Sequence, residues 1–206
     1  WFELWNQRKK RKFKVKKIVT LDNASQNSFC IDNNGFLGTT TTYSIILSSE
    51  YVKMYESILI LLNSKLLTFY HSKNTIPQAG GFYRYQASFI KSLPIKNLNL
   101  TFVADILLLL INQEKKIGTS ISDSLVYNIC FPDYMKALNI DVQNYIEQDI
   151  AAAMQDRAWE DLADEQKQEV IDQLHTTWTD PTNEVVKRMS QFKEKSPDIL
   201  KVIMES

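Results

Sequence analysis

The sequence predicts an α/β (α+β) protein in which a small strand-rich domain with one long amphipathic helix precedes a helical C-terminal portion. Short runs rich in β-branched residues, separated by turn residues, fill residues 17–48. Apolar residues recur at helical spacing over residues 50–71, and helical patterns resume from residue 102. We therefore expect an α/β domain over residues 1–96, helices packed on it over residues 97–140, and an acidic helical appendage over residues 141–206.

The composition is that of an ordinary soluble protein. The chain has 206 residues, of which 44% are hydrophobic and 23% charged, enough for one good-sized core. The longest uncharged apolar run is far shorter than the roughly 20 residues that span a bilayer, so we expect no membrane partner. The first residues, WFELWNQRKKRK, place apolar residues before basic ones, the reverse of a secretory signal. The opening tryptophan suggests a fragment of a longer chain.

The two cysteines limit which disulfides or metal sites the chain can form. Cys30 and Cys130 are far apart in sequence and belong to no CxxC pair or Cys/His cluster. Neither a disulfide framework nor a structural zinc site is indicated. This pattern fits a reducing, cytoplasmic location.

A net charge of zero hides a strong asymmetry between the two halves of the chain. Residues 1–100 carry 14 Lys/Arg against 5 Asp/Glu, whereas residues 101–206 carry 10 against 19. A basic half of this kind indicates a polyanionic partner, and an acidic half indicates another role.

The basic charge is concentrated near the N-terminus. From Lys12 the pattern alternates, which predicts a half-buried strand with lysines on one face and Phe13 and Val15 on the other. The run is open to two interpretations, a solvated basic arm or a surface that contacts DNA phosphates. The candidate phosphate contacts are Arg8, Lys9, Lys10, Arg11, Lys12, Lys14, Lys16 and Lys17.

Residues 17–48 predict three or four strands. The turn at residues 32–35 contains Asp, Asn and Gly, which tolerate the positive φ of tight turns. Residues 39–43 place four threonine hydroxyls and a tyrosine in a row. They can either bond phosphates and base edges or simply reflect β-propensity.

The next segment combines a helix with a glycine turn. Residues 50–71 predict a continuous amphipathic helix whose apolar stripe is core. Residues 73–81 lack periodicity and predict a loop, in which Gly80 and Gly81 permit positive φ or a close backbone approach. The following Tyr-Arg-Tyr triplet suits nucleic acid, because Arg can bind guanine or phosphate through two N–H groups.

The motifs of this region occur in a distinctive order. LLNSKL begins at residue 61, GGFYRY at residue 80 and LPI at residue 93, after the strands described above. In this order they resemble the C-terminal target-recognition domain of type IIG restriction-modification enzymes and related γ-class N6-adenine DNA methyltransferases. The resemblance covers residues 13–96 well, and residues 104–138 are similar to the segment after these motifs in that family.

The resemblance implies a bacterial DNA-binding module that reads a short sequence in double-stranded DNA. It implies methyltransferase domains earlier in the parent chain, often with a nuclease, which would use S-adenosylmethionine and possibly Mg²⁺; the fragment itself would need no cofactor. The candidate base-reading residues are Thr39, Thr40, Thr41, Thr42, Tyr43, Gly80, Gly81, Tyr83, Arg84, Tyr85 and Gln86.

Catalytic motifs are not evident. A methyltransferase of this class needs a glycine-rich turn and an Asn/Asp-Pro-Pro-aromatic motif, and the sequence has neither. Pro132-Asp133 with Glu165-Gln166-Lys167 imitates a nuclease metal site, but that site requires its acid and lysine on a strand. Residues 163–174 instead predict the start of a helix.

We therefore expect a non-catalytic recognition module braced by helices. The acidic helices would repel phosphates, so they should pack against protein. The alternative is a helical protein-interaction module whose basic arm is a nonspecific tether. A metal-dependent nuclease is a third and weaker hypothesis.

Overall fold

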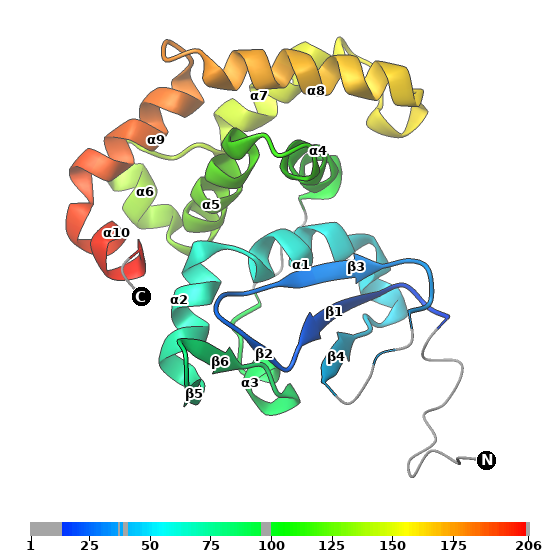
Figure 1. Ribbon diagram of the computed structural model, residues 1–206. Helices are drawn as coiled ribbons and strands as arrows, with labels where there is room; N and C mark the ends of the chain where they lie inside the picture. Colours follow the sequence, from blue (N-terminus) through cyan, green and yellow to red (C-terminus); the bar gives the residue numbers. More distant parts are fainter. Residues whose placement is uncertain (1–13, 37, 39–40, 96–99, 205–206) are drawn as a thin grey trace.

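The computed structural model describes residues 14–36, 38, 41–95 and 100–204. Its strands and first helices form one part of the molecule, and the later helices arch over that part (Figure 1). No helix within these described ranges has both the length and the apolar character needed to cross a membrane.

Two small antiparallel sheets form the strand-bearing part. The first has the order β3-β1-β4, from β1 (Lys17–Leu21), β3 (Phe29–Asp32) and β4 (Thr42–Ile45). The second has the order β2-β6-β5, from β2 (Asn23–Ala24), β5 (Pro77–Gln78) and β6 (Phe82–Arg84). The strands predicted within residues 17–48 are therefore confirmed. The strand predicted from Lys12 is wrong over its described part, because β1 begins only at Lys17 and Val15 is exposed.

The predicted long helix is broken into three pieces. They are the 3₁₀ helix η2 (Ser49–Met54), α1 (Tyr55–Leu62) and α2 (Lys65–Asn74). Asn63 leaves the helix to hold β3, since its side-chain amide donates to the Phe29 carbonyl and accepts from the Phe29 N–H, both at 2.9 Å. Ser64 then caps α2 by accepting from the N–H of Leu67. The Asn-Ser pair of LLNSKL is thus a helix break that anchors the first sheet.

Helices dominate the described residues after β6. After α3 (Ala87–Lys91), the bracing helices are α4 (Thr101–Asn112), α5 (Lys116–Cys130) and α6 (Pro132–Ala137). The C-terminal elements are α7 (Gln143–Met154), η3 (Trp159–Asp161), α8 (Asp164–Thr179), α9 (Glu184–Lys195) and α10 (Pro197–Met204). Gly118 lets α4 and α5 approach closely, because a Cβ at this position would lie 2.8 Å from the Cβ of Leu110.

One hydrophobic core joins the two parts of the molecule. A continuous cluster of buried side chains runs from Ile18 in β1 to Val185 in α9. In the acidic segment, Trp178 of α8 is fully buried and its indole N–H donates to Asp149 at 2.9 Å. The acidic helices therefore turn apolar faces to the protein and share the core with the strands.

Candidate nucleic-acid interface

Asp22 joins the two sheets and brings the two predicted base-reading segments together. Its backbone N–H donates to the Thr41 carbonyl at 2.8 Å, on the side of β4. Its own carbonyl accepts from the N–H of Tyr85 at 2.7 Å, on the side of β6. Residues 41–43 and the β5–β6 hairpin, about forty residues apart in sequence, therefore flank one residue.

Arg84 lies beside this joint with much of its side chain accessible. Its side chain is 37% exposed, and its Nη2 atom lies 3.5 Å from Oδ2 of Asp22. Its backbone is held firmly, because its carbonyl accepts from Nε2 of His71 at 3.0 Å and from the Thr75 hydroxyl at 2.6 Å. The structure thus presents a fixed backbone with a loosely held guanidinium.

The β5–β6 hairpin forms two of the three strands of the second sheet, at the lower left of Figure 1. Gly80 and Gly81 both adopt positive φ, 79° and 78°, as the glycine pair predicts. The segment is not the loop that its lack of periodicity predicts, since α2 extends to Asn74 and strands β5 and β6 follow. The turn and the side chain of Phe82 are exposed. Because β6 also pairs with β2, the exposed turn is the part of this hairpin that is accessible to DNA.

Tyr85 is wrongly assigned as a base-reading residue. Its side chain is fully buried, stacks on His71 with ring centroids 4.1 Å apart, and donates its hydroxyl to Asn27 at 2.9 Å. Burial raises the pKa of Tyr85 and lowers the pKa of His71, because the charged forms lose solvation. Tyr85 is therefore part of the core beneath the hairpin.

The other candidate base-reading residues remain at or near the surface. Tyr83, which precedes Arg84, and Gln86, which follows Tyr85, are both half-buried. Thr41 is exposed, and Thr42 and Tyr43 of β4 are half-buried opposite Leu21 and Thr20 of β1. Thr39 and Thr40 lie outside the described residues.

The predicted phosphate contacts divide into three groups. Arg8, Lys9, Lys10, Arg11 and Lys12 lie outside the described residues. Lys14 is exposed, and Lys16 is half-exposed while it pairs with Glu56 and lies over the ring of Tyr55. Lys17 is wrongly assigned, because its side chain is 2% exposed and its ammonium pairs with Asp32 inside the protein. This pairing lowers the pKa of Asp32.

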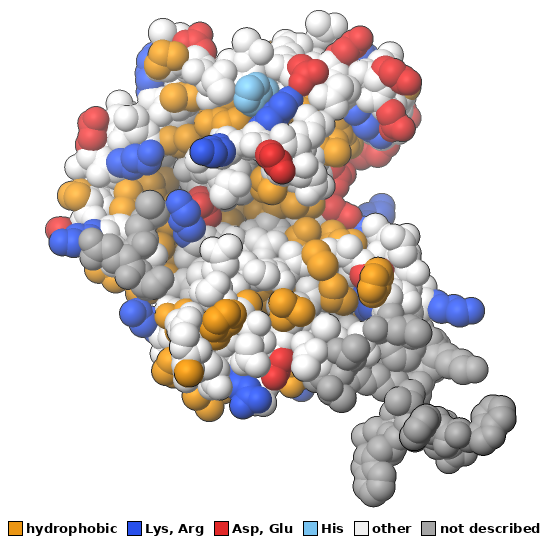
Figure 2. All heavy atoms as spheres, viewed as in Figure 1, with side chains coloured by type: hydrophobic (Ala, Val, Ile, Leu, Met, Phe, Trp, Pro, Cys, Tyr) orange, Lys and Arg blue, Asp and Glu red, His pale blue; other side chains and the backbone are white. Residues whose placement is uncertain are grey.

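Acidic side chains gather at the far end of the helical part, around η3 and the start of α8 (Figure 2, upper right). Glu160, Asp161, Asp164 and Glu165 are all exposed there. Asp164 also lines a cleft of about 870 Å³ whose walls come from β3, α1, α4 and α8. Burial and the nearby Glu56 raise the pKa of Asp105 in the same cleft. This acidic surface disfavours a polyanion.

The nuclease-like pattern does not have the geometry its chemistry needs. Glu165, Gln166 and Lys167 lie in the first turn of α8, which confirms the predicted helix start and excludes the strand that a metal site of that type uses. Asp133 lies in the first turn of α6. The described residues contain no group of three His, Cys, Asp or Glu side chains placed to hold a metal ion.

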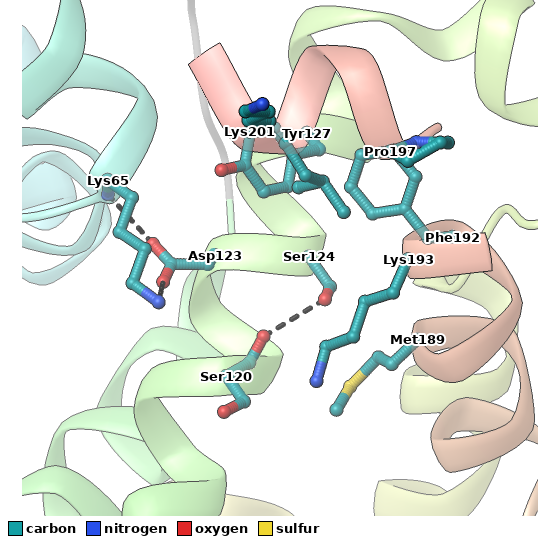
Figure 3. Close-up of a pocket in the computed structure, with 11 residues that line it drawn as sticks. Lys65, Ser120, Asp123, Ser124, Tyr127, Met189, Phe192, Lys193, Pro197 and Lys201 are labelled. Atoms are coloured by element: carbon teal, nitrogen blue, oxygen red, sulfur yellow. Dashed lines mark hydrogen bonds and ion pairs between the residues drawn. The ribbon is translucent and has the colours of Figure 1, made fainter. Parts of the chain in front are cut away.

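Helix α5 braces the recognition half at the start of α2. Asp123 of α5 accepts from the backbone N–H of Lys65, the first residue of α2, at 2.9 Å (Figure 3). A carboxylate at this position neutralises an otherwise unpaired N–H and suits the positive end of the helix. Asp123 also borders a pocket of about 400 Å³ between α5 and the last two helices, α9 and α10. The side chain of Lys193 points into this pocket (Figure 3).

Sequence reasoning missed Asp22, Asn27 and His71. All three organise the interface through partners more than ten residues away, such as Thr41, Tyr85 and Arg84. The DNAS stretch that contains Asp22 reads only as a turn. No local signal identifies it, because its role depends on which strands flank it.

The comparisons with known proteins agree with the resemblance found in the motifs. The search of curated proteins found no match. The model of the TaqI-like C-terminal specificity domain matches residues 1–95. Residues 1–95 thus match a C-terminal target-recognition domain of restriction-modification enzymes.

Proposed function

We propose that residues 1–95 are the DNA target-recognition module of a restriction-modification enzyme. The family match supports a specificity role. The observation that carries the proposal is the meeting of β4 and the β5–β6 hairpin at Asp22, with a partly exposed arginine between them. In this arrangement the N–H groups of the Arg84 guanidinium start from a fixed backbone position and are available to a groove of DNA.

The proposed mechanism is binding alone. Exposed cations such as Lys14 neutralise phosphates, which positions the protein without regard to sequence. The base edges in the major groove would be contacted by Arg84, Tyr83 and Gln86 from one side and by Thr41 and Thr42 from the other. The acidic end of α8 would be repelled by phosphates, so the DNA should lie on the strand-bearing part.

The parent enzyme is a further part of this proposal. We expect upstream domains on the same polypeptide that methylate adenine at N6 with S-adenosylmethionine, as in type IIG enzymes. Whether such a parent also cleaves DNA, with Mg²⁺, depends on a nuclease domain upstream. In either case this module supplies the choice of sequence, and the catalytic groups lie elsewhere.

A selection from random duplexes tests the proposal. The protein is incubated with a random duplex pool at several salt concentrations, and the bound DNA is sequenced. We expect one short motif to be enriched, and binding that weakens with salt with a log–log slope near −5 if about six phosphates are neutralised. Binding without enrichment of any motif, at every salt concentration, contradicts the proposal.

A protein-interaction module is the second candidate. Its support is a group of exposed apolar side chains on α6 and α10 and at their ends, namely Phe131, Tyr134, Ile199 and Val202. The hydroxyls of Tyr134 and Ser196 lie 2.7 Å apart, which places α6 next to the start of α10. This candidate predicts no enriched motif in the selection and a salt-dependent affinity common to all duplexes.

A further inference from the structure

We propose that Asp22 positions the Arg84 guanidinium to read a guanine in the recognised sequence. This inference rests on the proposed function, because it names one base that the module recognises and the residue that positions the arginine for it. Asp22 lies outside the sequence motifs, and the role proposed for it comes from the geometry of the joint between the two sheets.

The backbone of the pair is rigid. Asp22 is fixed by main-chain hydrogen bonds to Thr41 on one side and Tyr85 on the other. Arg84 pairs with Asn23 across β6 and β2, and two further donors hold its carbonyl. The two side chains therefore start from Cα positions that the fold fixes independently of either side chain.

The ion pair between them is incomplete. A guanidinium satisfied by a carboxylate uses two parallel N–H···O bonds of about 2.7–2.9 Å. Here the two side chains approach to 3.5 Å, from Nη2 to Oδ2. Oδ1 of Asp22 and Nε of Arg84 are both buried and have no hydrogen-bond partner among the described residues. The carboxylate attracts the guanidinium, yet most of its donors stay free.

A guanidinium that is held in one orientation and has unpaired N–H groups is suited to bind guanine. Arginine binds the O6 and N7 atoms of guanine through two N–H groups, and this contact is the commonest specific one in the major groove. A carboxylate behind the guanidinium limits its rotamers and turns its outer edge toward the groove. Without that carboxylate, the arginine would be free to contact phosphates, which carry no sequence information.

Asp22→Asn tests the inference with little change in shape. Asparagine keeps both main-chain hydrogen bonds of residue 22 and removes the charge that holds Arg84. Affinities are measured for the selected duplex, for mismatched duplexes, and for duplexes in which each guanine in turn is 7-deazaguanine, which lacks N7. For the wild-type protein, we expect one guanine at which 7-deaza substitution weakens binding about tenfold.

The expected result for Asp22→Asn is loss of most of that sensitivity, with equal or tighter binding to mismatched duplexes because a negative charge is gone. Arg84→Ala should lose the same sensitivity, and the double variant should match Arg84→Ala, since the two residues act as one unit. Asp22→Glu, which keeps the charge, should restore at least half of the discrimination. Glu50→Gln, which removes an exposed acid elsewhere in the same half, controls for net charge.

The outcomes separate the two proposals. If Asp22→Asn keeps the wild-type preference at every guanine, or loses no more than Glu50→Gln does, the positioning role of Asp22 is wrong while target recognition stands. If the wild-type protein enriches no motif, target recognition itself is wrong and the inference falls with it. Circular dichroism of each variant shows whether a lost preference reflects a lost fold.

Discussion

Two arginines, one in each part of the molecule, show how differently the same side chain is used. Arg188 of α9 has a side chain only 9% exposed, and its guanidinium contacts Asp141, Asn139 and Tyr145. Arg84 of β6 is 37% exposed and has one approach of 3.5 Å to a carboxylate. Nε lacks a hydrogen bond in both. The helical part thus holds Arg188 in place through several hydrogen bonds, whereas the recognition part leaves Arg84 available.

The same contrast separates the lysines at the N-terminal end of the first sheet. Lys17 is buried against Asp32, whereas Lys14 is exposed three residues earlier. A run of basic residues is therefore not one functional unit. The buried member supports the fold, and the exposed member is available to a polyanion.

The largest expected effect follows from removing the buried arginine. Arg188→Ala should lower the free energy of unfolding by about 3 kcal/mol, because it leaves the partly buried Asp141 without its partner. Arg84→Ala should lower it by less than about 1 kcal/mol, as is usual for a weakly paired surface group. Urea denaturation of both variants measures the difference. Equal losses would mean that Arg84 is a structural residue, and the contrast between the two parts would fail.

A smaller effect on stability is expected from His71, which bonds the backbone carbonyl of Arg84. Burial lowers the pKa of His71 below its ordinary value of 6.5, so the unfolded state binds more protons in that range. The stability that neutral His71 provides is therefore complete above pH 6.5 and is lost as pH falls from there toward the lowered pKa, by up to about 1.4 kcal/mol per pH unit.

His71→Gln tests this pH dependence. The glutamine amide can still donate to the Arg84 carbonyl but does not titrate, so its stability should vary less between pH 6.5 and 5. His175→Gln on α8 is the matched control and should keep the wild-type profile. Urea denaturation at each pH gives both curves, and a His71→Gln curve as steep as the wild type would show that another group causes the loss.

Much of this fold follows from local sequence patterns, and the failures have a common cause. The strands within residues 17–48, the positive φ at Gly80 and Gly81, and the helix start at α8 could all be predicted because they depend on neighbouring residues. The helix break at Asn63 could not, since its reason is a pair of hydrogen bonds to Phe29 across the fold.

The candidate site shows the same limit. The GGFYRY motif predicts an accessible Arg84, and the structure leaves it accessible. The same motif predicts that Tyr85 faces DNA, but Tyr85 fills the core on His71. Alternation along β6 separates adjacent side chains, but which of them faces inward depends on β2 and α2, which are distant in sequence. Asp22 could not be found for that reason either.

The central claim is that Arg84 reads bases while exposed lysines only hold phosphates. The most direct measurement compares Arg84→Ala and Lys14→Ala on the selected duplex and on a single-mismatch duplex at one salt concentration. We expect Lys14→Ala to weaken binding to both duplexes by the same factor. Arg84→Ala should weaken mainly the selected duplex, by about 1–3 kcal/mol, and so reduce discrimination. Equal losses on both duplexes for Arg84→Ala would contradict the claim.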